Sequence, residues 1–175
     1  VRPEKDPLTA YRAVTRLIQT QTVPARLVHL GGVLDAGLDA QLAAWVREQR
    51  APVQREGQVP HERVRQAMLE ADLLIAPSRM EGGALVLAEA VAVGLPIVAS
   101  RIPGHLGILG EQHPGWFEPG DPEDLAARLQ RWLSSPPDRQ ALQLASDAAC
   151  ERLTNHQAEA EALLSVLDRL QAAAG

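Results

Sequence analysis

Short apolar runs alternate along the chain with longer segments in which apolar residues recur at helical spacing. The apolar runs, bounded by Gly, Pro or Asp, predict strands at 25–32, 52–59, 72–78 and 95–100, with a short edge strand or turn at 113–120. The helical patterns lie at 9–20, 39–50, 61–71, 83–94, 102–110, 121–135, 136–153 and 155–174. Strands that alternate with helices in this way are typical of βαβ units around a parallel sheet.

Two of the runs, LLIA and PIVAS, are apolar without interruption, as expected of strands that helices cover on both faces. The pattern therefore predicts an α/β fold with a doubly wound, Rossmann-like parallel sheet. With 175 residues, of which 46% are hydrophobic, the chain is able to bury one sizeable core. We expect a single domain over 1–175, closed by a helix at about 154–174.

In sheets of this kind, ligands bind beyond the carboxyl ends of the strands, which directs attention to the loop SRMEGG after the strand at 72–78. The next helix is predicted to begin near Gly83 or Ala84. The first N–H groups of such a helix, those of Gly83, Ala84, Leu85 and Val86, have no intrahelical acceptor and form an anion site. Gly82 and Gly83 would let a ligand approach the backbone closely.

Two carboxylates, Glu81 and Glu89, flank this predicted anion site. Carboxylates do not bind phosphate, but they accept hydrogen bonds from sugar hydroxyls. A nucleoside-diphosphate sugar, with a sugar on each side of its diphosphate, suits that arrangement. The spacing alone also allows a structural interpretation, in which Glu89 is a solvated residue of an amphipathic helix and Glu81 a favourable acid near a helix start.

Composition narrows the classes of function. A formal net charge of −5 and a pI near 5.5 argue against nucleic-acid binding as the main task. No apolar run approaches the roughly 18 residues of a transmembrane helix, so no transmembrane segment is expected. The single cysteine, Cys150, suggests a reducing compartment, and we expect a cytoplasmic protein. No His, Cys and Asp cluster has the spacing of metal ligands, so no metal is expected.

The segment ADLLIAPSRMEGGALVLAEAVAVGLPIVAS resembles the donor-binding signature of the glycogen-synthase-like and family 4 glycosyltransferases of the GT-B fold. In that signature a strand ends in Pro-Ser and is followed by Glu, a Gly-rich turn, a second Glu followed by Ala, and Gly-x-Pro. The flanks are similar as well: VRPEKDP resembles the basic phosphate-contacting loop of the family, VQREGQV its base-contacting loop, and GWFEPGDPEDLAARL its late strand and helix.

The resemblance implies a role for each matching position. Glu81 would bind hydroxyls of the donor sugar, and Glu89 the ribose hydroxyls of the nucleotide. Lys5, the only lysine beside sixteen arginines, would neutralise the leaving diphosphate. The remaining positions are Arg2, a candidate for the arginine that the family places several residues ahead of the lysine; Gln58 and Val59, against the base; and Gly82, Gly83, Ala84 and Leu85, with backbone contacts to sugar and diphosphate. The donor would be a UDP-linked sugar, bound as a substrate and without a separate cofactor.

The family also implies a partner for this domain. Its members have two Rossmann-like domains, and the chain matches only the C-terminal, donor-binding one. The N-terminal acceptor domain would be missing here, so the fragment alone is expected to be inactive. The helix at 154–174 would either reach toward that missing half, as in the family, or pack on its own domain.

A narrower resemblance joins SRMEGGALVLAEA, RIPGHLGILG and the KDP start to the bacterial selenosugar synthases of the selenoneine pathway. It implies a UDP-N-acetylhexosamine donor and selenophosphate as the acceptor. His105, in the Pro-Gly-His loop, would face the donor phosphates or else be a surface or helix-capping histidine. Two other functions stay open: another GT-B enzyme such as a UDP-sugar epimerase, and a non-enzymatic receiver-like α/β interaction module, for which DAGLD is a poor match to the required acidic cluster.

Overall fold

The computed structural model describes residues 1–20 and 25–155 of the chain. Its strands are parallel and alternate with helices, which confirms the predicted α/β fold. The strands are β1 (Leu27–Leu30), β2 (Val53–Gly57), β3 (Leu74–Ala76), β4 (Ile97–Ser100) and β5 (Trp116–Phe117). The helices are η1 (Pro3–Lys5, a 3₁₀ turn), α1 (Pro7–Thr20), α2 (Ala36–Gln49), α3 (His61–Glu70), α4 (Leu85–Ala92), α5 (Pro103–Leu109), α6 (Pro122–Ser134) and α7 (Pro136–Leu153).

Some helices begin at other residues than their apolar patterns predict. α1 begins at Pro7, whose fixed φ suits a first helical position. α2 begins at Ala36 because the Asp35 carboxylate caps it, accepting from the Leu38 N–H at 2.8 Å. Of the closing helix predicted at 154–174, all but Thr154 and Asn155 lies outside the described residues. Within the described ranges, none of the helices combines the length and apolarity needed to cross a membrane.

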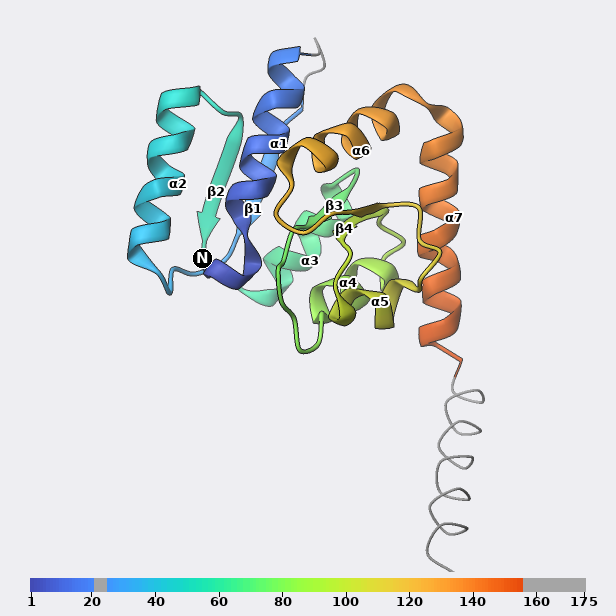
Figure 1. Cartoon of the computed structure of the whole chain (residues 1–175). Coiled ribbons are helices and arrows are strands. Elements are labelled where there is room, and N and C mark those ends of the chain that lie inside the picture. The colour runs from blue at the N-terminus through green and yellow to red at the C-terminus, as the bar shows by residue number, and fades with distance from the viewer. Residues whose placement is uncertain (21–24, 156–175) are drawn as a thin grey trace, which may run out of the picture.

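The strands form two separate hydrogen-bonded sheets where the sequence predicts one. β1 pairs with β2, and β4 lies between β3 and β5. In the part of the chain that the structure describes, no ladder joins β1 to β3. Both of these strands are short, and a side chain from each, Leu27 of β1 and Ile75 of β3, packs against the same core cluster. Figure 1 shows β1 and β2 with α2 at one end of the molecule and α7 at the other.

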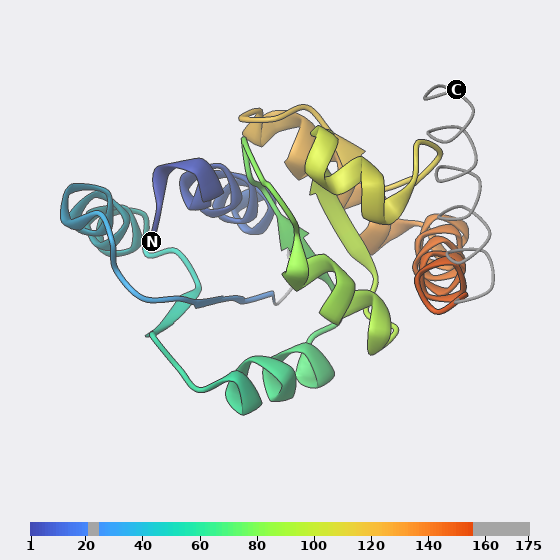
Figure 2. The same cartoon turned by 90° about the horizontal axis from the view of Figure 1, so that it is seen from below.

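The central strand β4 explains why its sequence is continuously apolar. Ile97 and Ala99 belong to a cluster with residues of α4, whereas Val98 belongs to a second cluster with residues of α1 and α6. Successive side chains of a strand point to opposite faces, so both faces of β4 are covered. Figure 2 shows α3 on one side of these strands and α1 with α6 on the other. The layers are those of a doubly wound fold.

The carboxyl edge of the strands collects the loops that matter for function. The arrow of β2 in Figure 1 points toward the edge at which η1 and the beginnings of α4 and α5 lie. The first residues of the chain are tied to this edge, because the N–H groups of Leu34 and Asp35, in the loop after β1, donate to the main-chain oxygen of Val1 at 3.1 and 3.2 Å.

Candidate functional site

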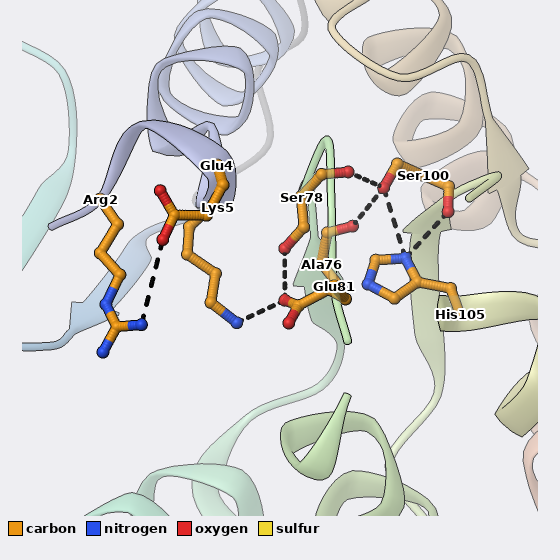
Figure 3. Close-up of polar contacts among 8 residues, drawn as sticks. All are labelled: Arg2, Glu4, Lys5, Ala76, Ser78, Glu81, Ser100 and His105. Atoms are coloured by element: carbon orange, nitrogen blue, oxygen red, sulfur yellow. Dashed lines mark hydrogen bonds and ion pairs between the residues drawn. The ribbon is translucent and has the colours of Figure 1, made fainter. Parts of the chain in front are cut away.

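Glu81 lies in the loop between β3 and α4, and its carboxylate has two partners. The ammonium of Lys5, at the end of η1, donates to Oε1 of Glu81, and the Ser78 hydroxyl donates to the same oxygen at 2.7 Å. The Glu81 side chain is only 8% exposed, whereas that of Lys5 is 44% exposed. The structure thus brings the two predicted catalytic residues together, and Figure 3 shows them in contact.

These partners keep the buried carboxyl ionised. Burial by itself raises the pKa of Glu81, because it disfavours the charged form. The hydrogen bonds from Lys5 and Ser78, together with the charge of Lys5, outweigh that effect and hold the pKa of Glu81 below its ordinary 4.5. At neutral pH, Glu81 is therefore a charged acceptor at the carboxyl edge of the strands.

A second set of contacts holds the Lys5 segment against the Glu81 loop. The main-chain N–H of Arg79 donates to the main-chain oxygen of Glu4 at 2.8 Å, and its guanidinium Nε donates to Asp6 at 2.7 Å. The Thr9 hydroxyl donates to the same Asp6 oxygen at 2.8 Å. Asp6 adopts a left-handed conformation with φ 41°, which turns the chain from η1 into α1. Lys5 is therefore placed by its backbone as well as by its ion pair.

On its other side, the Glu81 loop rests on the connection between β4 and α5. A Cβ added at Gly104 would lie only 2.5 Å from the main-chain oxygen of Glu81, so this close approach requires a glycine. The fully buried Ser100 hydroxyl donates to the main-chain oxygen of Ser78. The ring of His105 is bonded in turn to the main-chain oxygen of Ser100, at 2.9 Å from Nδ1.

His105 is not the surface or helix-capping residue that one sequence interpretation allows. Its exposed fraction is 0%, and α5 has no side-chain cap at its first turn. Its Nε2 has no hydrogen-bond partner among the described residues. Burial lowers the pKa of His105 below 6.5, so the ring is neutral near pH 7.

The anion site predicted at the start of α4 differs in detail from its sequence pattern. The helix begins at Leu85, with Ala84 at the cap position, and the Leu85 N–H is not free because it donates to the Gly83 oxygen at 3.0 Å. The N–H groups of Gly82, Gly83, Ala84 and Val86 donate no hydrogen bond to any acceptor among the described residues. A Cβ at Gly82 or Gly83 would meet nothing within 4 Å, so these two glycines border open space.

Glu89 lies in α4 and is partly buried, with 27% of its side chain exposed. Its Oε1 is 2.9 Å from Nε2 of His61, the first residue of α3. The second predicted carboxylate therefore has a partner that the sequence pattern did not reveal. The contact lies at the surface, since the His61 side chain is 73% exposed, so the structural interpretation of Glu89 as a solvated helix residue stays open.

The other predicted binding residues surround this edge without touching Glu81 directly. The Gln58 side chain, after β2, lies against Gly32, where an added Cβ would come 3.2 Å from its Oε1. Val59 follows it and is half-buried. Arg2 is exposed, and its guanidinium is 3.9 Å from the Glu4 carboxylate. In the view of Figure 3, Lys5 lies between Arg2 and Glu81.

A cleft elsewhere on the molecule has a volume of about 520 Å³. Its lining includes Asp72 and Pro96, which precede β3 and β4, so it opens at the amino edge of the strands. Among the described residues that line it, Asp72 is the one carboxylate, so the cleft offers no pair like Glu81 and Glu89. In the described ranges, no group of three or more His, Cys, Asp or Glu side chains is placed to hold a metal ion.

The family model described as "Glycosyl transferases group 1" matches residues 1–147. The chain belongs to this family. The match decides against a receiver-like interaction module. A group 1 domain with this order of strands and helices is one Rossmann-like half of a GT-B fold.

Two curated relatives illustrate the relationship. The amylovoran biosynthesis glycosyltransferase AmsK of Erwinia amylovora is 35% identical over 118 residues, which cover 63% of this chain and 29% of AmsK. The D-inositol 3-phosphate glycosyltransferase of a Nocardioides species is 33% identical over 156 residues, covering 81% of this chain and 34% of that protein. The chain thus spans about a third of the length of these relatives.

Solved structures show the likeness of fold. HepE of Anabaena, in complex with UDP and glucose, superposes with a TM-score of 0.73 at 20% identity, over 94% of this chain and 46% of HepE. The C-terminal domain of the group 1 glycosyl transferase LpcC of Francisella tularensis gives a TM-score of 0.76 at 16% identity, over 87% of this chain and 80% of that domain.

Several residues at the site of this group 1 domain were not predicted from the sequence. Ser78 stands inside the quoted motif and could have been found from it, because a hydroxyl three residues before a buried carboxylate is a natural donor. His61 opens the helix after the Gln58 loop, at the same edge of the strands. Arg79, Ser100 and Gly104 act through contacts between segments far apart in the chain, for which a single sequence carries no signal.

Proposed function

We propose that this chain is the nucleotide-sugar-binding domain of a glycosyltransferase that uses a UDP-linked donor. One observation carries the proposal: the buried, ionised Glu81 is paired with Lys5 directly beside the unbonded N–H groups that precede α4. A charged acceptor, a partly exposed cation and free backbone donors are together the groups that a sugar diphosphate needs.

The diphosphate would lie at the start of α4. The N–H groups of Gly82, Gly83 and Ala84 and the positive end of the helix dipole favour a negative charge there. The open space beside the glycines leaves room for the phosphates to reach the backbone. Lys5 would stabilise the charge that grows on the diphosphate as the sugar leaves, which is the main catalytic contribution expected of this half of the enzyme.

The carboxylates of Glu81 and Glu89 would each bind one of the two sugars of the donor. Glu81 would accept hydrogen bonds from hydroxyls of the transferred sugar, and Glu89 from the ribose hydroxyls. In this arrangement His61, which now occupies Oε1 of Glu89, would share that carboxylate with the ribose. Gln58 and Val59 would lie against the uracil base, and Arg2 would remain a peripheral positive charge.

The comparisons support a uridine nucleotide in general terms. HepE, which shares this fold, was solved with UDP and glucose, and separately with UDP-glucose. The AmsK relative is a glycosyltransferase by name. The complete enzyme would contain a second Rossmann-like domain that binds the acceptor, and this chain alone would bind the donor without transferring the sugar.

The acceptor remains a prediction from sequence. The resemblance to selenosugar synthases predicts selenophosphate as acceptor and a UDP-N-acetylhexosamine as donor. An assay of the complete enzyme with UDP-N-acetylglucosamine and selenophosphate tests it, with inorganic phosphate as the control acceptor. Release of UDP only with selenophosphate is expected, and no UDP release above the phosphate control would reject that acceptor.

Calorimetric titration of this chain tests the donor site. UDP and UDP-glucose should both bind, and Glu89→Gln should weaken both by about 10- to 100-fold, the cost of leaving ribose hydroxyls unpaired. Glu81→Gln should spare UDP and remove only the additional affinity that glucose confers. Glu62→Gln, a neighbouring exposed acid in α3, is the matched control and should change neither. Binding that ignores both site variants would reject the proposed roles.

A further inference from the structure

One ring nitrogen of His105 is satisfied and the other is not. Nδ1 lies 2.9 Å from the main-chain oxygen of Ser100, and a carbonyl only accepts, so Nδ1 carries the hydrogen of the neutral ring. Nε2 is then a bare acceptor, buried and without a hydrogen-bond partner among the described residues. A buried polar atom in that state is uncommon and calls for an explanation.

The position of the ring points to Glu81. His105 follows Gly104, whose backbone is so close to Glu81 that an added Cβ would come within 2.9 Å of the Glu81 Cβ. In the view of Figure 3, Glu81 lies between Lys5 and His105, and the ring edge that carries Nε2 is turned to the side of Glu81. Glu81 therefore has one basic group bonded to it and a second, unpartnered one nearby.

Two anionic groups compete for the Lys5 ammonium: the Glu81 carboxylate and the proposed donor diphosphate. Lys5 holds the Glu81 carboxylate in this structure, yet the function proposed above places the same ammonium on the donor diphosphate. Lys5 is about half-exposed and able to turn, whereas Glu81 is buried and cannot follow it into solvent. A buried carboxylate that loses its cation is strongly destabilised, and the neutral Ser78 hydroxyl does not replace the lost charge.

We propose that His105 is a positioning residue that takes up a proton at Nε2 and becomes the cationic partner of Glu81 when Lys5 turns to the diphosphate. This inference rests on the proposed donor site. The proton comes from solvent, the Nδ1 hydrogen bond to Ser100 is kept, and only the contact between Lys5 and Glu81 is released. Glu81 then stays ionised and in place to accept from the sugar.

Two charged groups that face His105 influence its pKa. They are Glu81 in the loop before α4 and Lys5 in η1. Burial lowers the pKa of His105, the Ser100 carbonyl and the Glu81 charge raise it, and the Lys5 charge lowers it. Removal of Lys5 from the pair takes away one depressing influence, and the arriving diphosphate adds negative charge. Both changes favour the imidazolium.

Nitrogen NMR of the His105 ring tests this without any ligand, because Lys5→Met imitates the departure of Lys5. The wild-type ring should be the neutral Nδ1–H tautomer at pH 7. In Lys5→Met its titration midpoint should rise by about 1 to 3 pH units, the usual effect of an unscreened neighbouring carboxylate. Adding Glu81→Gln to Lys5→Met should cancel the rise. Arg101→Met, which removes an exposed cation paired with Glu111, should leave the midpoint unchanged.

The same experiment is able to overturn the inference. If the His105 midpoint in Lys5→Met equals that of the wild type, or if the ring stays neutral because Glu81 itself takes the proton, His105 is not the second partner. His105→Asn identifies the His105 signals by their loss. Asn keeps a donor near the Nδ1 position and so preserves the bond to Ser100.

Binding calorimetry separates this inference from the donor site itself. UDP-glucose is titrated into the chain at pH 7 in two buffers that differ in ionisation enthalpy. The wild type should take up a fraction of a proton per ligand bound, and His105→Asn should bind with no uptake. Binding heat without proton uptake in the wild type would reject the role of His105 and leave the donor site intact. Absence of binding would reject the donor site, while the NMR result for Lys5→Met still decides the charge relationship.

Discussion

Lys5 and Glu81 lie 76 residues apart in the chain, yet the Lys5 ammonium donates a hydrogen bond to the Glu81 carboxylate. The contact joins the turn before α1 to the loop before α4, at the carboxyl edge of the strands. It places the sole lysine of the chain and a buried acceptor in one pair. In the proposed function, that pair opens when a sugar diphosphate enters.

The first prediction concerns the stability that this pair supplies. Lys5→Met should lower the free energy of unfolding by about 1–3 kcal/mol, because it leaves the buried carboxylate without its charged donor. Urea denaturation measures the change. Arg2→Met is the matched control: its exposed contact with Glu4 should be worth less than about 0.5 kcal/mol. Equal losses in the two variants would show that the Lys5 contact contributes nothing specific.

A second prediction follows from the lowered pKa of Glu81. A carboxyl whose folded pKa lies below its unfolded value stabilises the fold above the unfolded pKa and loses that effect as the pH falls. The stability difference between the wild type and Glu81→Gln should therefore be constant at neutral pH and shrink below about pH 4.5. Denaturation series at several pH values measure it. A difference that grows on acidification would contradict the charged, paired state of Glu81.

Tyr11 offers a third prediction, because it is the only tyrosine of the chain. Its hydroxyl is 2.7 Å from Nδ1 of His29 and its side chain is buried, and burial raises its pKa from 10.0 to about 12. The ultraviolet absorbance of tyrosinate should therefore show no transition near pH 10 in the folded chain. In urea, the same residue should titrate near pH 10. A folded-state midpoint near 10 would show that the contact between α1 and β1 is open.

His113 gives a fourth prediction, in the acid range. Burial lowers the pKa of this histidine from 6.5 to about 4, and the charge of Arg152 acts in the same direction. The unfolded chain takes up this proton first, so stability should fall by roughly 3 kcal/mol as the pH drops from about 6.5 to 4. His113→Asn keeps an acceptor near the Gly115 N–H and cannot titrate, so its stability should be flatter over that range. If the free energy of unfolding fell equally with pH in the wild type and in His113→Asn, the prediction would be wrong.

Much of the fold could be predicted from the sequence, because local patterns carry it. The strand at Val53–Gly57 and the short helix at Pro103–Leu109 both lie where the pattern placed them. The uninterrupted apolar run of β4 correctly indicated a strand covered on both faces. The split into two sheets was not predictable, since strand pairing depends on the geometry of the whole sheet rather than on the composition of β1 or β3.

The site, too, was predictable only where its residues lie close together in the sequence. The motif predicted Glu81, Glu89 and the glycine turn, because those residues stand close together in the sequence. It did not predict that Lys5 would bond Glu81 directly, or that His61 would bond Glu89, because such contacts depend on how loops of distant segments meet. Their roles in binding a donor stay predictions until the ligand is tested.

The most direct test of the donor site is the amide NMR spectrum of the chain titrated with UDP-glucose. We expect the backbone N–H signals of Gly82, Gly83, Ala84 and Val86 to shift most, and Glu89→Gln to require a higher ligand concentration for the same shifts. Signals of Asp72 and Gln143, at the cleft on the amino edge, should stay in place. No shifts at millimolar UDP-glucose, or shifts confined to that cleft, would contradict a nucleotide-sugar site at the start of α4.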